Sequence, residues 1–152
     1  MKPLSFLLLI PFVFVACSRD TAFDRFSITQ HQKLAENSIQ SSKIKYKNSI
    51  DGVVNVVYLN EVLPKEYNNH EYFYVYLYTK DKNPKLTFLL NKKPALHITK
   101  LDASNRFTKL ISFDAPWSQY YLVEFPKQGD KLHFKLKNKQ FNSDILKFEK
   151  DK

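Results

Sequence analysis

The chain has 152 residues, of which 24 are lysine or arginine and 15 are acidic, so its formal net charge is +9. Hydrophobic residues make up 43% of the sequence, which is enough for one apolar core in a single domain of ordinary length. A single cysteine excludes any disulfide within the chain, so the fold has to depend on that core.

The first 17 residues have the layout of a secretory signal. Lys2 supplies a positive start, residues 4–15 are apolar except for Ser5 and Pro11, and the small residue Ala16 precedes Cys17. The apolar run is much shorter than the roughly 20 residues that a membrane-spanning helix needs. We therefore expect a signal peptide over residues 1–17.

The sequence Phe14-Val15-Ala16-Cys17 resembles the lipobox of bacterial lipoproteins, in which leucine is preferred at the position of Phe14. The resemblance implies that Cys17 carries a diacylglyceryl group and that cleavage before Cys17 exposes an amino terminus that is acylated. The protein would then be held on the lipid bilayer of the bacterial envelope. Ser18 lacks the aspartate associated with inner-membrane retention, which favours the outer membrane in a Gram-negative cell. A soluble secreted protein with a free cysteine is the alternative.

The segment after the anchor divides into a tether over residues 18–21 and a possible helix over residues 22–41. Asp20 and Thr21 are suitable N-caps, and apolar residues such as Phe23, Phe26 and Leu34 follow with loose helical spacing. An irregular tether is the alternative to a helix here. Residues 42–152 are expected to form one β domain.

Period-two alternation dominates this second part of the chain and indicates short strands between turn residues. The strands expected from it are 53–59, 70–79, 85–90, 94–100, 108–113, 117–125, 131–137 and 146–149. The first of them is apolar on both faces, which is typical of a central strand. Eight short strands predict a mainly β fold: a single antiparallel β-sandwich with an immunoglobulin-like strand count.

One predicted strand, over residues 70–79, carries two kinds of side chain in alternation. Phe73, Val75 and Leu77 occupy one face and are expected in the core, because they need no hydrogen-bond partner there. The other face is a candidate aromatic binding face that is expected to point outward. Burial of that face under the N-terminal helix or neighbouring side chains is the alternative. Its residues are Tyr72, Tyr74, Tyr76 and Tyr78.

A basic stripe lies on another predicted strand, where Lys131, His133, Lys135 and Lys137 alternate with apolar residues. The stripe could face lipid or an acidic polymer. Lysines also protect edge strands from pairing with other sheets, and the sequence does not choose between these readings.

No pattern in the sequence indicates catalysis or cofactor binding. The four histidines fall in separate segments without the spacing of a zinc site, so no metal and no cofactor is expected. Two glycines leave no room for a glycine-rich phosphate loop, and no catalytic residue can be named. Arginine, whose planar fork suits phosphate recognition, occurs only as Arg19, Arg25 and Arg106, and nucleic acid is not expected as a partner outside the cytoplasm.

Three functions are compatible with these features. The leading hypothesis is a membrane-anchored, non-catalytic binding or assembly accessory whose partner is an envelope protein or an anionic envelope polymer. The second is a small envelope hydrolase whose catalytic residues converge only in the fold. The third is a purely structural lipoprotein.

Lipidation of Cys17 gives a direct prediction. Intact mass spectrometry of protein extracted from membranes should show a chain that begins at Cys17 and carries acyl mass. Cys17→Ala should abolish both the cleavage and the added mass. Recovery of an unmodified chain from the soluble fraction would contradict the assignment.

Overall fold

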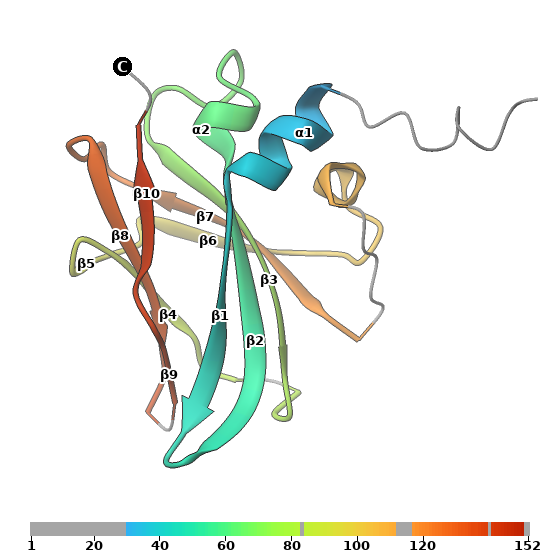
Figure 1. Ribbon diagram of the computed structural model, residues 1–152, viewed down its shortest axis with the longest axis vertical. Helices are drawn as coiled ribbons and strands as arrows, with labels where there is room; N and C mark the ends of the chain where they lie inside the picture. The colour runs from blue at the N-terminus through green and yellow to red at the C-terminus, as the bar shows by residue number, and fades with distance from the viewer. Residues whose placement is uncertain (1–29, 83, 112–116, 140, 151–152) are drawn as a thin grey trace, which may run out of the picture.

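The computed structural model describes residues 30–82, 84–111, 117–139 and 141–150, and antiparallel strands form most of it. The mainly β class predicted from the sequence is therefore confirmed (Figure 1). The elements are α1 (Gln30–Asn37), β1 (Ile39–Tyr46), β2 (Ser49–Tyr58), α2 (Leu59–Val62), β3 (Glu71–Thr79), β4 (Thr87–Leu90), β5 (Lys93–Pro94), β6 (His97–Leu101), the 3-10 helix η2 (Arg106–Leu110), β7 (Gln119–Phe125), β8 (Lys131–Lys137), β9 (Asn142–Ser143) and β10 (Leu146–Glu149).

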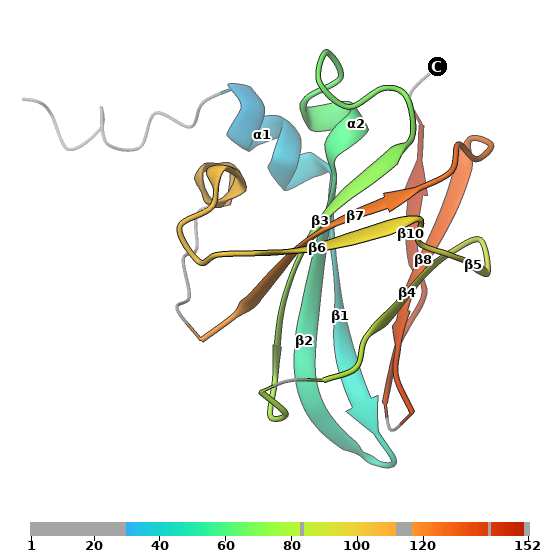
Figure 2. The ribbon, with the colours of Figure 1, turned by 180° about the vertical axis from the view of Figure 1, so that it is seen from behind.

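The strands belong to one sheet that curls into a half-barrel (Figures 1 and 2). Their order is β5-β4-β8-β9-β1-β2-β3-β7-β6, with β10 paired to β8, so the predicted sandwich is not confirmed. Although β5 and β6 lie at opposite ends of this order, they follow each other in the chain. The Ala95 amide donates to the Phe88 carbonyl, and the Leu96 amide donates to the Glu124 carbonyl. This short segment thus contacts both ends of the sheet and keeps it curled.

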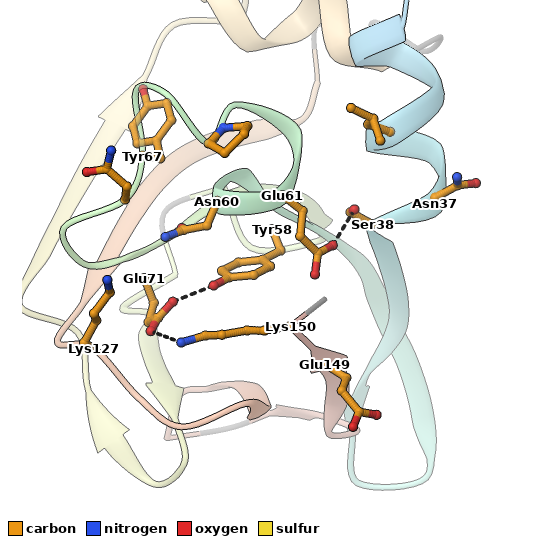
Figure 3. Close-up of a pocket in the computed structure, with 13 residues that line it drawn as sticks. Asn37, Ser38, Tyr58, Asn60, Glu61, Tyr67, Glu71, Lys127, Glu149 and Lys150 are labelled. Atoms are coloured by element: carbon orange, nitrogen blue, oxygen red, sulfur yellow. Dashed lines mark hydrogen bonds and ion pairs between the residues drawn. The ribbon is translucent and has the colours of Figure 1, made fainter. Parts of the chain in front are cut away.

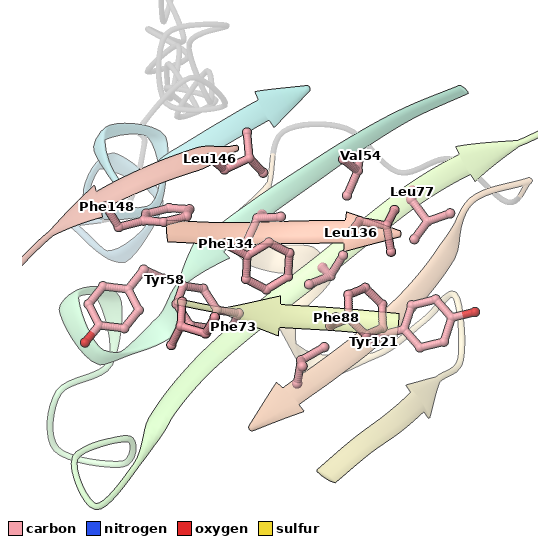
Figure 4. Close-up of a cluster of buried hydrophobic side chains, with 14 of the residues drawn as sticks. Val54, Tyr58, Phe73, Leu77, Phe88, Tyr121, Phe134, Leu136, Leu146 and Phe148 are labelled. Carbon is pink, nitrogen blue, oxygen red and sulfur yellow. The ribbon is translucent and has the colours of Figure 1, made fainter. Parts of the chain in front are cut away.

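The inner face of the half-barrel holds the larger core cluster (Figure 4). Phe73, Val75 and Leu77 of β3 point into it, as the alternation predicted, and all three are fully buried. Phenylalanines from strands on both sides of the half-barrel, such as Phe73 and Phe134, pack with ring centroids 5.1 Å apart. Apolar area removed from water, at about 25 cal/mol per Å², is the main stabilising contribution of this cluster.

A second cluster lies on the outer face of the sheet, under α1, α2 and η2. It contains Tyr74, which is 0% exposed, and Tyr76, which is 8% exposed, whereas Tyr78 beyond the helices is 46% exposed. The prediction that the tyrosines of β3 point to solvent is therefore wrong for Tyr74 and Tyr76. The helices and the ring of Tyr120, stacked on Tyr74, exclude water from these two side chains.

Two further expectations about the elements need correction. The helix ends at Asn37 and the chain is already extended at Ile39, so the expected end of the helix at residue 41 is too late. The start of that helix falls on residues outside the described ranges. Thr108 and Leu110 lie in η2 and not in a strand, because Phe107 and Leu110 turn inward to cover the outer face.

Burial on both faces of β3 predicts a specific order of mutational effects. Phe73→Ala and Tyr74→Ala should each lower the free energy of unfolding by about 3–5 kcal/mol, because each deletes a buried ring. Tyr78→Ala should cost less than about 1 kcal/mol, since this ring is partly in water. Urea unfolding measures all three. A Tyr74→Ala effect as small as that of Tyr78→Ala would contradict the burial of the outer face.

Candidate functional site

A cavity of about 630 Å³ lies at one end of the half-barrel, next to α1 and α2 (Figure 3). Its volume is within the range typical of small-molecule sites. Aromatic, amide, carboxylate and ammonium groups all face it. The residues that line it are Leu34, Asn37, Ser38, Tyr58, Asn60, Glu61, Pro64, Tyr67, Asn68, Glu71, Lys127, Glu149 and Lys150.

The charged groups reach this cavity through the same alternation that builds the inner core. Glu71 lies two residues before Phe73 on β3, and Lys150 lies two residues after Phe148 of β10. Residues two apart on a strand share a face. The inner face therefore carries the Glu71 carboxylate next to Phe73 on β3. It carries the Lys150 ammonium group next to Phe148, just after the end of β10.

Glu71 is the centre of the polar network in this cavity. Its carboxylate is fully buried and accepts hydrogen bonds from the Tyr58 hydroxyl at 2.6 Å, the Lys150 ammonium at 2.6 Å and the backbone N–H of Gln128 at 2.9 Å. Burial alone would raise the pKa of Glu71, but these three donors and the charge of Lys150 together lower it below its usual value. The carboxylate is thus held ionised.

This network limits what Glu71 can do chemically. Both carboxylate oxygens already have donors. Burial, and to a smaller extent the hydrogen bond to Glu71, raises the pKa of the Tyr58 hydroxyl, so this hydroxyl stays protonated and donates to Glu71. A general acid or base needs a proton that can be exchanged with a substrate near the working pH. The arrangement is therefore that of a structural ion pair at the wall of a cavity.

Other polar groups of the cavity lie closer to its rim. The Ser38 hydroxyl donates to the Glu61 carboxylate at 2.7 Å and links the end of α1 to α2. Lys127 and Glu149 are exposed there. These groups give the rim both signs of charge.

The basic stripe predicted on the strand 131–137 lies on the outer face of β8, opposite the inner core. Lys131, His133 and Lys137 are exposed and Lys135 is half-buried. β8 is not an edge strand, since it pairs with β4 on one side and with β9 and β10 on the other. Protection of a sheet edge therefore does not explain these residues.

A groove of about 480 Å³ runs along this basic stripe. The side chains of Leu89 and Ile145 provide apolar surface in it, and Lys92 adds another ammonium group. Asn91 fixes one side: its side chain donates to the Lys131 carbonyl at 3.1 Å and accepts from the His133 amide at 2.9 Å. The left-handed backbone of Asn91 and Lys92 forms the turn that places them there.

Of the four tyrosines proposed as a binding face, Tyr78 is exposed and Tyr72 is half-buried, whereas Tyr74 and Tyr76 are buried. Tyr72 donates to Glu124 at 3.2 Å, and the same carboxylate oxygen lies 2.5 Å from Nδ1 of His70. This cluster was not predicted, because 54 residues separate His70 from Glu124 in the chain.

Within the described residues, no group of three or more histidine, cysteine or acidic side chains could hold a metal ion. The helices in these ranges are too short and too polar to cross a bilayer. Cys17 and the tether over residues 18–21 lie outside the described ranges.

Comparisons with protein-family models, with curated proteins and with solved structures give no match for this chain.

The depressed pKa of Glu71 predicts how stability depends on pH. A carboxyl group whose pKa is lower in the folded state stabilises the fold above its usual value of 4.5, and this contribution is lost as the pH falls through the folded-state value. Glu71→Gln should lower the free energy of unfolding at neutral pH by about 2–4 kcal/mol, because Lys150 loses its partner. Glu71→Gln should also make the free energy of unfolding fall less steeply as the pH drops below the usual carboxyl pKa of 4.5.

A matched control is the exposed ion pair of Lys45 with Asp144, in which Lys45 Nζ lies 3.1 Å from Asp144 Oδ2. Asp144→Asn should change the free energy of unfolding by less than about 1 kcal/mol, since exposed pairs contribute little. Urea titrations at several pH values measure both variants. Equal effects of Glu71→Gln and Asp144→Asn would contradict the role of the buried pair.

Proposed function

We propose that this protein is a lipid-anchored, non-catalytic binding accessory of the bacterial envelope, and that its ligand is an anionic envelope polymer. One observation carries the proposal: the outward side chains of β8 are three lysines and a histidine, of which Lys131, His133 and Lys135 border a groove. Because β8 has strands paired on both sides, these outward-facing residues are not needed to protect a sheet edge, which supports a role in binding.

The spacing of the cations suits a linear polyanion. Side chains two residues apart on a strand lie about 6.7 Å apart, so Lys131 to Lys137 extend over about 20 Å. Lysine is a flexible point charge, which suits a row of separate phosphate or carboxylate groups better than one rigid bidentate group. Leu89 and Ile145 add apolar surface for the backbone of such a polymer.

The state of Glu71 supports binding over hydrolysis. The alternative of a small envelope hydrolase requires an acid, base or nucleophile that is available to a substrate. Glu71, the buried carboxylate at the cavity beside α1 and α2, is instead saturated by three donors.

The envelope location is proposed from the resemblance of residues 14–17 to a lipobox. A lipid anchor on Cys17 would hold the domain at a bilayer, with the outer membrane favoured in a Gram-negative cell. Several acyl chains on one residue make release negligible, since each buried methylene contributes about 0.8 kcal/mol.

Charge reversal in the groove tests the proposal. The double variant Lys131→Glu/Lys135→Glu should bind polyphosphate and polygalacturonate at least about tenfold more weakly, because each basic residue at an anionic surface contributes about 1 kcal/mol. Polyphosphate and polygalacturonate represent phosphate and carboxylate polymers, and titration calorimetry at low salt measures the affinity for each.

The matched control is Lys33→Glu/Lys109→Glu, which changes the net charge equally but places the changes on α1 and η2. This variant should keep most of the affinity of the wild type. If both double variants lose the same affinity, net charge alone explains the binding and the groove has no special role.

A further inference from the structure

The outer face of the sheet has a part that α1, α2 and η2 do not cover. In that part, Val53 of β2 is 40% exposed and Tyr78 of β3 is 46% exposed. The two residues are paired across the strands, so their side chains lie next to each other on the same face. Apolar surface on neighbouring exposed positions of two strands is unusual for a sheet face in water.

A bulge adds Ile50 to the same surface. Val53 pairs with Lys43 and Ile50 pairs with Lys45, while the register shifts between them. Lys43 and Lys45 are two residues apart and share a face, so their partners Val53 and Ile50 share it too. Ile50 is 51% exposed there. At Gly52 a Cβ would lie 1.9 Å from the Tyr78 carbonyl oxygen, so the close packing of β2 on β3 depends on this glycine.

Trp117 extends the surface beyond β3. It is the single tryptophan of the chain and is 64% exposed. It lines a cleft of about 380 Å³ together with Tyr78 and the lysines 80, 82 and 100. The Gln119 side chain donates to the Lys82 carbonyl at 3.2 Å and ties the start of β7 to the turn that carries these lysines.

Lysines surround this apolar and aromatic surface. Lys43 and Lys45 flank it on β1, and lysines 80, 82 and 100 flank it near Trp117. The acidic residues near this surface are Asp51, Asp81, Asp102 and Asp144, of which Asp144 pairs with Lys45. Five lysines and four carboxylates therefore leave a small excess of positive charge around the exposed rings and aliphatic side chains.

We propose that Ile50, Val53, Tyr78 and Trp117 form a membrane-contact patch that lies at the headgroup level of an anionic bilayer. Tryptophan and tyrosine favour the interface between headgroups and acyl chains, because one end of each ring system is polar. Aliphatic side chains enter the acyl boundary, and lysines around them bind anionic headgroups. The patch combines these three features on one face.

The position of α1 agrees with contact between this patch and a bilayer. This agreement rests on the proposed lipid anchor at Cys17. Ala35 of α1 packs in the outer cluster with Tyr74 and Tyr76, so α1 lies on the same side of the sheet as the patch (Figure 1). Thirteen residue steps from Cys17 to Gln30 can span at most about 45 Å. A lipid on Cys17 can therefore hold this face against the bilayer, with the basic groove of β8 on the opposite side.

Fluorescence of Trp117 tests the proposal directly. The lipidated protein is reconstituted in vesicles of equal parts phosphatidylethanolamine and phosphatidylglycerol that carry brominated acyl chains. Trp117 emission should shift to the blue and be quenched by the bromine atoms. Ile50→Ser should shift the equilibrium between docked and undocked protein roughly tenfold and reduce both signals, because it removes buried methylenes from the bilayer.

Ile145→Ser is the matched control, since Ile145 is also an exposed isoleucine, 55% accessible, but lies in the groove beside β8. This variant should retain the wild-type shift and quenching. Lys80→Glu/Lys82→Glu should weaken quenching on these vesicles. Emission that vesicles do not change, or equal losses in Ile50→Ser and Ile145→Ser, would overturn the proposal.

Intact mass separates this inference from the proposed anchor. A lipidated chain whose Trp117 is not quenched overturns the membrane-contact patch and leaves the anchor. An unmodified chain whose Trp117 is quenched when the same vesicles are added removes the anchor and supports the patch. Thermal unfolding of each variant verifies that the exposed substitutions leave the fold intact.

Discussion

The buried carboxylate of Glu71 connects parts of the half-barrel that strand pairing leaves apart. β10 pairs with β8, and Lys150 after β10 reaches Glu71 on β3, 79 residues away in the chain. The Tyr58 hydroxyl on β2 and the backbone N–H of Gln128, between β7 and β8, complete the set of donors. A buried charge is costly unless its partners are all present, so the curled sheet and this network depend on each other.

A sheet held in this curl has two outer faces that point in opposite directions from one inner core. The face of β2 and β3 carries α1, α2 and η2 and, beyond them, exposed apolar and aromatic side chains. The face of β8 carries cations and a groove. A protein tethered to a bilayer through the N-terminal side could use the first face toward lipid and the second toward a polymer. The cavity beside Glu71 lies where the Glu71–Lys150 pair joins β3 to the end of β10.

The sequence predicted the inner face well, because period-two alternation is fixed by strand geometry and apolar side chains need no specific partner. Phe73 and Phe134 illustrate this. Cover of the outer face by the N-terminal helix was the alternative to exposure, and Ala35 of α1 does pack there. The cover by Phe107 and Leu110 was missed, because the apolar spacing of residues 108–113 resembles that of a strand. The basic stripe on β8 was visible, although its central position was not. The pair Glu71–Lys150 depends on the curl of the sheet, and the pair His70–Glu124 depends on the pairing of β3 with β7, neither of which a local pattern encodes.

We propose that the two outer faces of the half-barrel have opposite orientations relative to a bilayer. Paramagnetic broadening of backbone amide resonances, with a gadolinium-bearing headgroup lipid in nanodiscs that hold the lipidated protein, measures these orientations. We expect the strongest broadening at Ile50, Val53 and Tyr78, and little at His133 and Lys135. Broadening that is strongest along β8, or uniform over both faces, would contradict this proposal.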